Sequence, residues 1–314
     1  MTAPSSALMP AGSVRVLRVG TRGSALALVQ TQRVIDALKT TAPHVQCEVV
    51  VISTQGDRDK QTPLSQIGGQ GVFASEIQQA LLRGEIDCAV HSAKDLPSQL
   101  PDGSLLAAVL DREDRRDALV SRYAGGIAGL PPGARVGASS PRRRAQLLVT
   151  RPDVEMVELR GNVDTRMRKV LDDPEQAYDA ALLAVAGVER MGWGDRISER
   201  LDVATFTPAP GQGALAVECR SDDSAVQALL EAVADPNATA EVAAERAFLR
   251  AIGGGCRSPL AATAQVVGDR IHIWAMFADE GMSRVAFTQD EADLDDGPDL
   301  AQRLARELQK QVAQ

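Results

Sequence analysis

The fold is indicated by the stretch from residue 14 to residue 39, which reads VRVLRVGTRGSALALVQTQRVIDALK. Its first six residues read as a β-strand, and residues 25–39 carry apolar side chains at helical spacing. Residues 47–52 then read as a second strand. Strands separated by a helix predict a parallel sheet with right-handed crossovers, whose ligands gather beyond the carboxyl ends of the strands.

The alternation of strands and helices continues through most of the chain. After a Gly-rich loop that ends at Gly71, we expect a helix at 72–83 and a strand at 86–90. The charged residues 111–116 precede a segment rich in glycine and proline, and we place a crossing between two lobes there. A second α/β unit follows, with strands at 134–137, 154–158 and 179–185, helices at 141–150 and 162–172, and a short helix ending at Met191.

The chain is then expected to return to the first lobe and to form a third domain. Residues 205–213, TFTPAPGQG, are typical of a return crossing, because residues 214–220 follow as another strand. A helix at 238–252 ends at three glycines, which is a normal stop. A small antiparallel sheet and a last helix complete the chain, with strands at 261–267, 270–278 and 284–288, a turn at 268–269, and the helix at 298–313.

Length and composition agree with this organisation. A chain of 314 residues with 44% apolar and 24% charged side chains predicts two or three globular domains. The fold class is therefore α/β with three domains: residues 1–112 with 210–231, residues 113–209, and an α+β domain at 232–314. No stretch approaches the roughly 20 apolar residues that span a bilayer, and no export signal is recognisable, so we expect a cytoplasmic protein.

Charge is distributed unevenly along the chain. The net charge of -8 argues against a nucleic-acid surface over the whole molecule. Residues 135–170 nevertheless hold nine basic and four acidic side chains, a local excess of +5 that leaves -13 elsewhere. Of the 34 basic residues 29 are arginine, whose planar fork suits carboxylates and phosphates. The four cysteines and three histidines are scattered, so we expect neither a disulfide framework nor a metal site.

Two segments predict anion sites at strand ends. Residues 139–144, SSPRRR, follow an expected strand and open a helix, where backbone N–H groups, hydroxyls and guanidinium groups favour an anion. Residues 159–166, LRGNVDTR, repeat the pattern, with Arg160 before a helix and Arg166 in its first turns. One ligand with several carboxylates or phosphates would meet both segments. The alternative is that these arginines are solvated on helix faces.

Two further features stand out by their placement. Asp95 follows Lys94 at an expected strand end in HSAKDLP, 91–97, where a carboxylate serves general acid–base catalysis or holds a cationic intermediate. The alternative is a turn with a solvated ion pair. Cys256 follows three glycines and precedes Arg257, and a cation beside an exposed thiol favours the thiolate. The other cysteines fit buried strand positions.

Nine motifs in a fixed order carry a resemblance to one known family. They are TRGSALAL (21–28), GGQGVF (68–73), HSAKDLP (91–97), EDRRDA (113–118), SSPRRRAQL (139–147), LRGNVDTR (159–166), LAVAGVERMG (183–192), PAPGQGALAVECR (208–220) and GGGCRSPLAA (253–262). Together they resemble the porphobilinogen deaminase family, also called hydroxymethylbilane synthase. The resemblance covers nearly the whole chain, and only the first dozen residues and the C-terminal strands and helix match weakly.

The resemblance implies a transferase of tetrapyrrole and haem biosynthesis. Enzymes of this family condense four porphobilinogen molecules head to tail, with loss of ammonia, into the linear tetrapyrrole hydroxymethylbilane on a dipyrromethane primer. The resemblance implies a thioether between this cofactor and Cys256 of the third domain, and two lobes like those of periplasmic-type binding proteins. It also implies a monomer without membrane or nucleic-acid partners, and a hand-over of the product to uroporphyrinogen-III synthase.

The resemblance also assigns site residues. Asp95, with Lys94, is implied to be catalytic, assisting deamination and stabilising the positively charged azafulvene and pyrrole intermediates. The positions implied to bind the cofactor are Cys256, Lys94, Ser140, Arg142, Arg143, Arg160, Arg166 and Leu183. The positions implied to bind or line the substrate site are Arg22, Ser24, Phe73, Ser92, Arg190 and Gln212.

Departures from the family pattern and two rival functions remain open. Gln55, Gln70, Ala138 and Asp164 replace residues that are common in the family, and Gln70 removes a cation from the loop thought to cover the site. A non-catalytic anion-binding module would explain the arginines but not the GGGC loop. A nucleic-acid binder is disfavoured by the acidic remainder and by only nine aromatic residues. The mass of the intact protein separates the three, because only the deaminase carries a dipyrromethane adduct.

Overall fold

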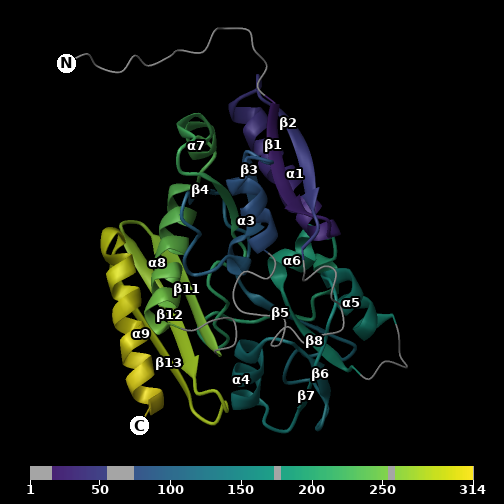
Figure 1. Cartoon of the computed structure of the whole chain (residues 1–314). Coiled ribbons are helices and arrows are strands. Elements are labelled where there is room, and N and C mark those ends of the chain that lie inside the picture. The colour runs from purple at the N-terminus through teal and green to yellow at the C-terminus, as the bar shows by residue number, and fades with distance from the viewer. Residues whose placement is uncertain (1–15, 55–73, 173–177, 254–258, 314) are drawn as a thin grey trace, which may run out of the picture.

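The computed structural model describes residues 16–54, 74–172, 178–253 and 259–313. Within them the chain forms two lobes, each built from a sheet and helices, and a smaller C-terminal domain beside them (Figure 1). The expected Gly-rich loop before residue 74, with Phe73, and the glycine loop with Cys256 lie outside the described residues.

The first lobe is a five-stranded sheet in the order β2-β1-β3-β10-β4. The strands β1, β2 and β3 are parallel, as predicted, whereas β10 is antiparallel to both β3 and β4. The strand β10 enters from the other lobe and not through a helical crossover, and its direction was not predicted. The elements are β1 (Val16–Arg22), α1 (Ala25–Thr41), β2 (Gln46–Ile52), α3 (Ser75–Leu82), β3 (Cys88–Ser92), the 3-10 turn η1 (Ala93–Asp95), β4 (Ser104–Val109), β10 (Leu215–Arg220) and α7 (Ser224–Glu231).

The second lobe repeats this plan in the order β7-β6-β8-β5-β9. Here β6 pairs in parallel with β7 and β8, while β5 is antiparallel to β8. The sequence did not predict β5, because its five residues follow a densely charged segment. The elements are β5 (Asp117–Ser121), β6 (Arg135–Gly137), α4 (Pro141–Thr150), β7 (Glu155–Val157), α5 (Val163–Leu171), β8 (Ala180–Ala184), α6 (Val185–Arg190), η2 (Gly194–Arg196) and β9 (Glu199–Arg200).

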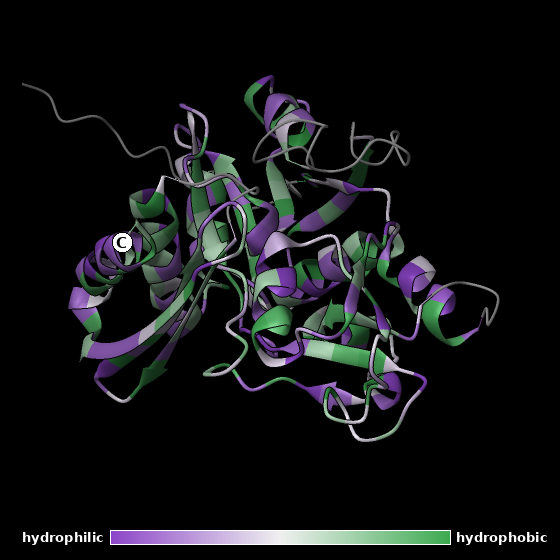
Figure 2. Ribbon diagram, turned by 90° about the horizontal axis from the view of Figure 1, so that it is seen from below, coloured by the Kyte–Doolittle hydropathy of each residue, from purple (hydrophilic) through white to green (hydrophobic). Residues whose placement is uncertain are grey.

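The third unit is the predicted antiparallel sheet, in the order β11-β12-β13. Its core is formed by apolar residues such as Phe248, Ile273 and Leu304, all 0 or 1% exposed. In Figure 2 its helices carry both hydrophilic and hydrophobic residues along their length, as expected for helices with one buried face. The elements are α8 (Pro236–Ile252), β11 (Leu260–Val267), β12 (Arg270–Ala278), β13 (Val285–Asp293), η3 (Leu294–Asp296) and α9 (Gly297–Ala313).

Two chain segments connect the lobes and contact each other. Residues 110–116 lead from β4 to β5, where a crossing was predicted, and residues 201–214 lead back to β10. The guanidinium group of Arg112 donates to the carbonyl oxygen of Gln212 from Nε at 3.0 Å and Nη2 at 2.9 Å. The domain boundaries themselves stay a prediction. No helix in the described part of the chain is long and apolar enough to cross a membrane.

Candidate active site

A pocket lies at the carboxyl ends of β1 and β3, where the fold predicts a ligand. Its lining includes Arg22, Ser24, Gln30, Ser92 and Asp95. Ser24 is the N-cap of α1, and the Gln30 amide donates to Ser92 Oγ at 2.9 Å. The structure thus brings together four predicted site residues and adds Gln30, which is 4% exposed. A cation, two hydroxyls, an amide and a carboxylate in one pocket suit a small polar ligand.

Lys94 and Asp95 lie in the 3-10 turn that directly follows β3. Lys94 Nζ donates to Gln212 Oε1 at 3.3 Å, so the amine points toward the return crossing. The pKa of Lys94 is lowered to about 8, mainly by burial and then by the charge of Arg143, against the opposing effects of Asp95 and Asp117. Close to neutral pH, part of this lysine therefore carries no charge.

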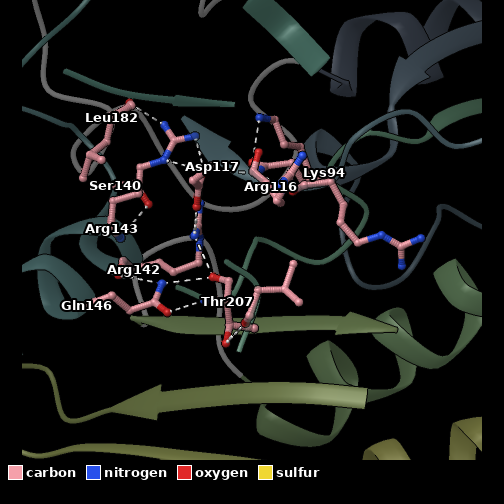
Figure 3. Close-up of polar contacts among 12 residues, drawn as sticks. Lys94, Arg116, Asp117, Ser140, Arg142, Arg143, Gln146, Leu182 and Thr207 are labelled. Carbon is pink, nitrogen blue, oxygen red and sulfur yellow. Dashed lines mark hydrogen bonds and ion pairs between the residues drawn. The ribbon is translucent and has the colours of Figure 1, made fainter. Parts of the chain in front are cut away.

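The second lobe presents Ser140, Arg142 and Arg143 at the start of α4. Ser140 is the N-cap, and its Oγ accepts the backbone N–H of Arg143 at 3.5 Å, as expected for a serine before Pro141 at the first helical position. The side chains of Arg142 and Arg143 are buried and converge on Asp117 (Figure 3). The arginine pair predicted to bind carboxylates therefore already holds one carboxylate of this chain.

Asp117 is a site residue that the sequence analysis missed. It is fully buried as the first residue of β5 and lies 2.6 Å from Arg143 Nη2. Burial alone would raise the pKa of this carboxyl, but the charges and hydrogen bonds of Arg142 and Arg143 hold it well below its usual range. The signal was present in EDRRDA, but a charged motif does not reveal which of its carboxylates is buried.

Arg166 lies on α5 and faces the same group of charges. Its Nε donates to the carbonyl oxygen of Gly161 at 2.8 Å. The pKa of Arg166 is lowered to about 10, mainly by burial and then by the charges of Arg143 and Arg160, and Asp95 opposes this shift. Arg166 is therefore within electrostatic range of residues from both lobes. Two cations, Lys94 and Arg166, thus have lowered pKa values for the same reasons.

Two predicted site residues lie outside the pocket and away from the carboxylate of Asp117. The Leu183 side chain is 2% exposed in β8 and packs in the core of the second lobe. Arg190 is 8% exposed at the end of α6, where its Nε lies 2.7 Å from Glu113 and its Nη2 donates to the carbonyl oxygen of Gly213 at 2.7 Å. Both contacts tie Arg190 to the segments that cross between the lobes. No group of three or more potential metal ligands occurs among the residues that the structure describes.

Family models match almost the entire chain. The model described as porphobilinogen deaminase, dipyromethane cofactor binding domain, matches residues 17–228, and the model of the C-terminal domain of porphobilinogen deaminase matches residues 239–310. The chain belongs to the porphobilinogen deaminase family. It is an enzyme that condenses porphobilinogen into hydroxymethylbilane with dipyrromethane as its cofactor.

Curated relatives give the same family. A porphobilinogen deaminase from Syntrophus aciditrophicus is 45% identical over 92% of this chain and 94% of its own length. One from Pelobacter propionicus is 46% identical over 94% of this chain and 92% of its own. Among solved structures, an arginine-specific periplasmic binding protein of Salmonella typhimurium covers 72% of this chain and 96% of its own at 14% identity and a TM-score of 0.38. Such a low score says nothing about what this chain binds.

The described residues fit the cofactor of the porphobilinogen deaminase family. Dipyrromethane carries several carboxylates on its acetate and propionate side chains. Burial and, to a smaller extent, neighbouring arginines lower the pKa of Lys94 and Arg166, and an anionic ligand would stabilise the charged form of both groups. The donor set of arginines, a lysine and serine hydroxyls is the one that carboxylates prefer.

Proposed function

We propose that the condensation takes place between the two lobes, at Asp95, within a group of charges that we call the cleft cluster. The observation that supports this placement is the excess of cations over carboxylates in this group, in which the pKa of both Lys94 and Arg166 is lowered by burial and, to a smaller extent, by neighbouring arginines. The cleft cluster consists of Lys94, Asp95, Asp117, Arg142, Arg143, Arg160 and Arg166.

Asp95 is the proposed catalytic carboxylate. Positive charge develops on the substrate as ammonia leaves and again as the new carbon–carbon bond forms, and a fixed anion stabilises that charge. The same carboxylate then accepts the proton that the new bond displaces. The 3-10 turn after β3 fixes Asp95 at the wall of the pocket beside Ser92, where a substrate ring would lie.

The cations and hydroxyls are the proposed carboxylate binders. Arg22, Ser24 and Ser92 share the pocket with Asp95, so they would take the acetate and propionate groups of the incoming substrate. The cofactor carboxylates would meet Lys94, Ser140, Arg142, Arg143, Arg160 and Arg166. Phe73, Leu183, Arg190 and Gln212 remain positions proposed from the family resemblance, of which Gln212 contacts Lys94 directly.

Cys256 is the proposed attachment point of the cofactor. When bound, the dipyrromethane supplies the pyrrole carbon on which the tetrapyrrole chain begins to grow. The mass of the intact protein tests this proposal: the parent should carry a dipyrromethane adduct, and Cys256→Ser should fold without one and be inactive, because a hydroxyl is a poorer nucleophile than a thiolate. Full activity with no adduct in either protein would rule out Cys256.

We also propose that the protein is a cytoplasmic monomer. Its first domain comprises residues 1–112 and 210–231, its second residues 113–209 and its third residues 232–314. Its product would pass to a uroporphyrinogen-III synthase. Size-exclusion chromatography with light scattering tests the monomer, and a mass of two chains would overturn it.

A further inference from the structure

Asp117 accepts hydrogen bonds from three side chains, although the proposed function gives it no role of its own. It is 0% exposed and accepts hydrogen bonds from two side chains of α4 and one of the return crossing. Arg142 donates from both Nη atoms, Arg143 from Nε at 3.0 Å and Nη2 at 2.6 Å, and Gln212 from Nε2 at 3.0 Å. Charge-assisted bonds of this kind are about twice as strong as neutral ones, so the carboxylate fixes all three side chains.

The two arginines are held at second points as well. Arg142 Nη1 donates to the carbonyl oxygen of Thr207 at 2.8 Å, and Arg143 Nη1 donates to that of Leu182 at 2.9 Å. A guanidinium group is a planar fork, so a carboxylate and a carbonyl together set both its position and its plane. The N–H groups that remain on each arginine are thereby oriented before any ligand arrives.

Gln212 extends this arrangement to the other lobe. Its Nε2 donates to Asp117 and to the carbonyl oxygen of Arg115 at 2.9 Å, while its Oε1 accepts from Lys94 Nζ at 3.3 Å. The amide therefore connects a buried carboxylate to an ammonium group in the only orientation that satisfies both. Lys94 is the residue next to Asp95. A continuous set of hydrogen bonds thus runs from α4 through β5 and the return crossing to η1.

We propose that Asp117 is a positioning residue, which orients Arg142 and Arg143 toward the ligand carboxylates and, through Gln212, holds Lys94 beside Asp95. The proposal rests on the roles given above to the arginines and to Lys94. It treats Asp117 as a residue that does not touch the substrate itself. Its loss should therefore weaken carboxylate binding more than it slows the chemistry at Asp95.

The first test measures the amine of Lys94 directly and needs no turnover. Trace acetic anhydride labels the purified holoenzyme over a range of pH, with exposed Lys310 as the internal reference. Preparations are matched for cofactor content by intact mass. Asp117→Asn removes a negative charge that supports the lysine cation, so the labelling midpoint of Lys94 should fall by about half a pH unit or more. Asp117→Glu, which keeps the charge, should restore most of the midpoint.

The second test is the division between KM and kcat. Asp117→Asn should raise KM about tenfold or more, as expected for a weakened charge-assisted contact, with a smaller change in kcat. Asp87→Asn is the matched control, because Asp87 is also a buried aspartate paired with an arginine, Arg18, but lies just before β3, at the end away from Asp95. It should lose stability while the midpoint of Lys94 and KM stay at the parent values.

If Asp117→Asn does not fold, a second variant still tests the proposal. Gln212→Met keeps both arginine pairs of Asp117 and removes the acceptor of Lys94 together with the amide donor to Asp117, so it should also lower the labelling midpoint and raise KM. Folded variants with the parent midpoint and KM within twofold of the parent would overturn the proposal. If the parent itself showed no condensation, the roles under the proposed function would fail, whereas the labelling midpoints would still decide on Asp117.

Discussion

Two groups of charged residues near the inter-lobe crossing differ in their balance of charge. One is the cleft cluster; the other, which we call the junction cluster, consists of Arg112, Arg115, Glu241 and Glu245. In the junction cluster Arg112 Nη1 lies 2.7 Å from Glu245 and 3.2 Å from Glu241, and Arg115 lies 3.0 Å from Glu241. Burial alone would lower the pKa of Arg112, but the two carboxylates raise it above its usual value.

The cleft cluster has an excess of one sign. Its five cations face only two carboxylates of the cluster, Asp95 and Asp117, and the pKa of Lys94 falls to about 8 as a result of burial and neighbouring arginines. In a balanced cluster each buried charge has its partner within the chain, so the cluster needs no ligand to compensate it. An uncompensated excess of one sign disfavours the empty site and favours a ligand of opposite charge. The count of cations against carboxylates separates the two clusters, since the pKa is lowered for Arg115 of the junction cluster as well as for Lys94 and Arg166 of the cleft cluster.

The largest effect on stability is expected when one carboxylate of the junction cluster is neutralised. Glu245 is fully buried and accepts hydrogen bonds from Arg112 and from the backbone N–H of Gly211 and Ala264. Glu245→Gln leaves a buried guanidinium short of one charge, which costs about 3–5 kcal/mol of unfolding free energy. We expect the lower end, because Arg112 keeps Glu241.

Denaturant unfolding measures that loss, with Glu307→Gln as the control. Glu307 is an exposed partner of Arg303 on α9, and its substitution should cost less than about 1 kcal/mol. Equal stability of Glu245→Gln and the parent would show that the junction cluster contributes nothing to folding.

In the cleft cluster the largest effect is expected on turnover. Asp95→Asn is nearly isosteric, so the binding geometry should survive while the charge and basicity are lost. Turnover should fall at least about a hundredfold, with a much smaller change in KM, because the cations hold the substrate carboxylates. Steady-state kinetics measure the split. Turnover within a few-fold of the parent would show that Asp95 only forms a turn.

Removing one cation of the cleft cluster should affect ligand binding more than stability. Arg166 donates to a backbone carbonyl oxygen, and Arg166→Leu should weaken condensation or cofactor loading by about 10- to 150-fold, equivalent to 1.5–3 kcal/mol. Arg168→Leu, on the same helix, removes an arginine paired with Asp164 and should behave as the parent. Kinetics and intact mass give both readouts. Equal effects of the two substitutions would place Arg166 among the solvated arginines.

The last prediction concerns the dependence of stability on pH. The pKa of Lys94 is about 8 in the folded protein and 10.5 in an ordinary lysine, so the unfolded chain binds more protons between these values. Stability should therefore rise with pH through this window, by at most about 1.4 kcal/mol per pH unit from this group. Lys94→Met should lose that rise in denaturant unfolding at the two ends of the window. An unchanged rise would mean that Lys94 is not the titrating group.

Much of the fold was predictable because it depends on local pattern. Residues 141–150 carry a serine, a proline and helical periodicity in sequence, and α4 occupies the predicted residues. The strand β5 was missed because five apolar-rich residues after a charged segment give no periodic signal. The missed β4 and α7 are similarly short. The direction of β10 was not predicted, because pairing between strands more than a hundred residues apart depends on the path of the whole chain.

The sequence by itself determined the family, the alternation of strands and helices, and the strand ends that carry Asp95, Arg142 and Arg143, since each is written in contiguous motifs. Only the tertiary structure decided which charges are compensated. Asp117, Gln212 and Lys94 are close in space and distant in sequence, and the energy of a charge depends on its burial and on its neighbours, which no local pattern specifies.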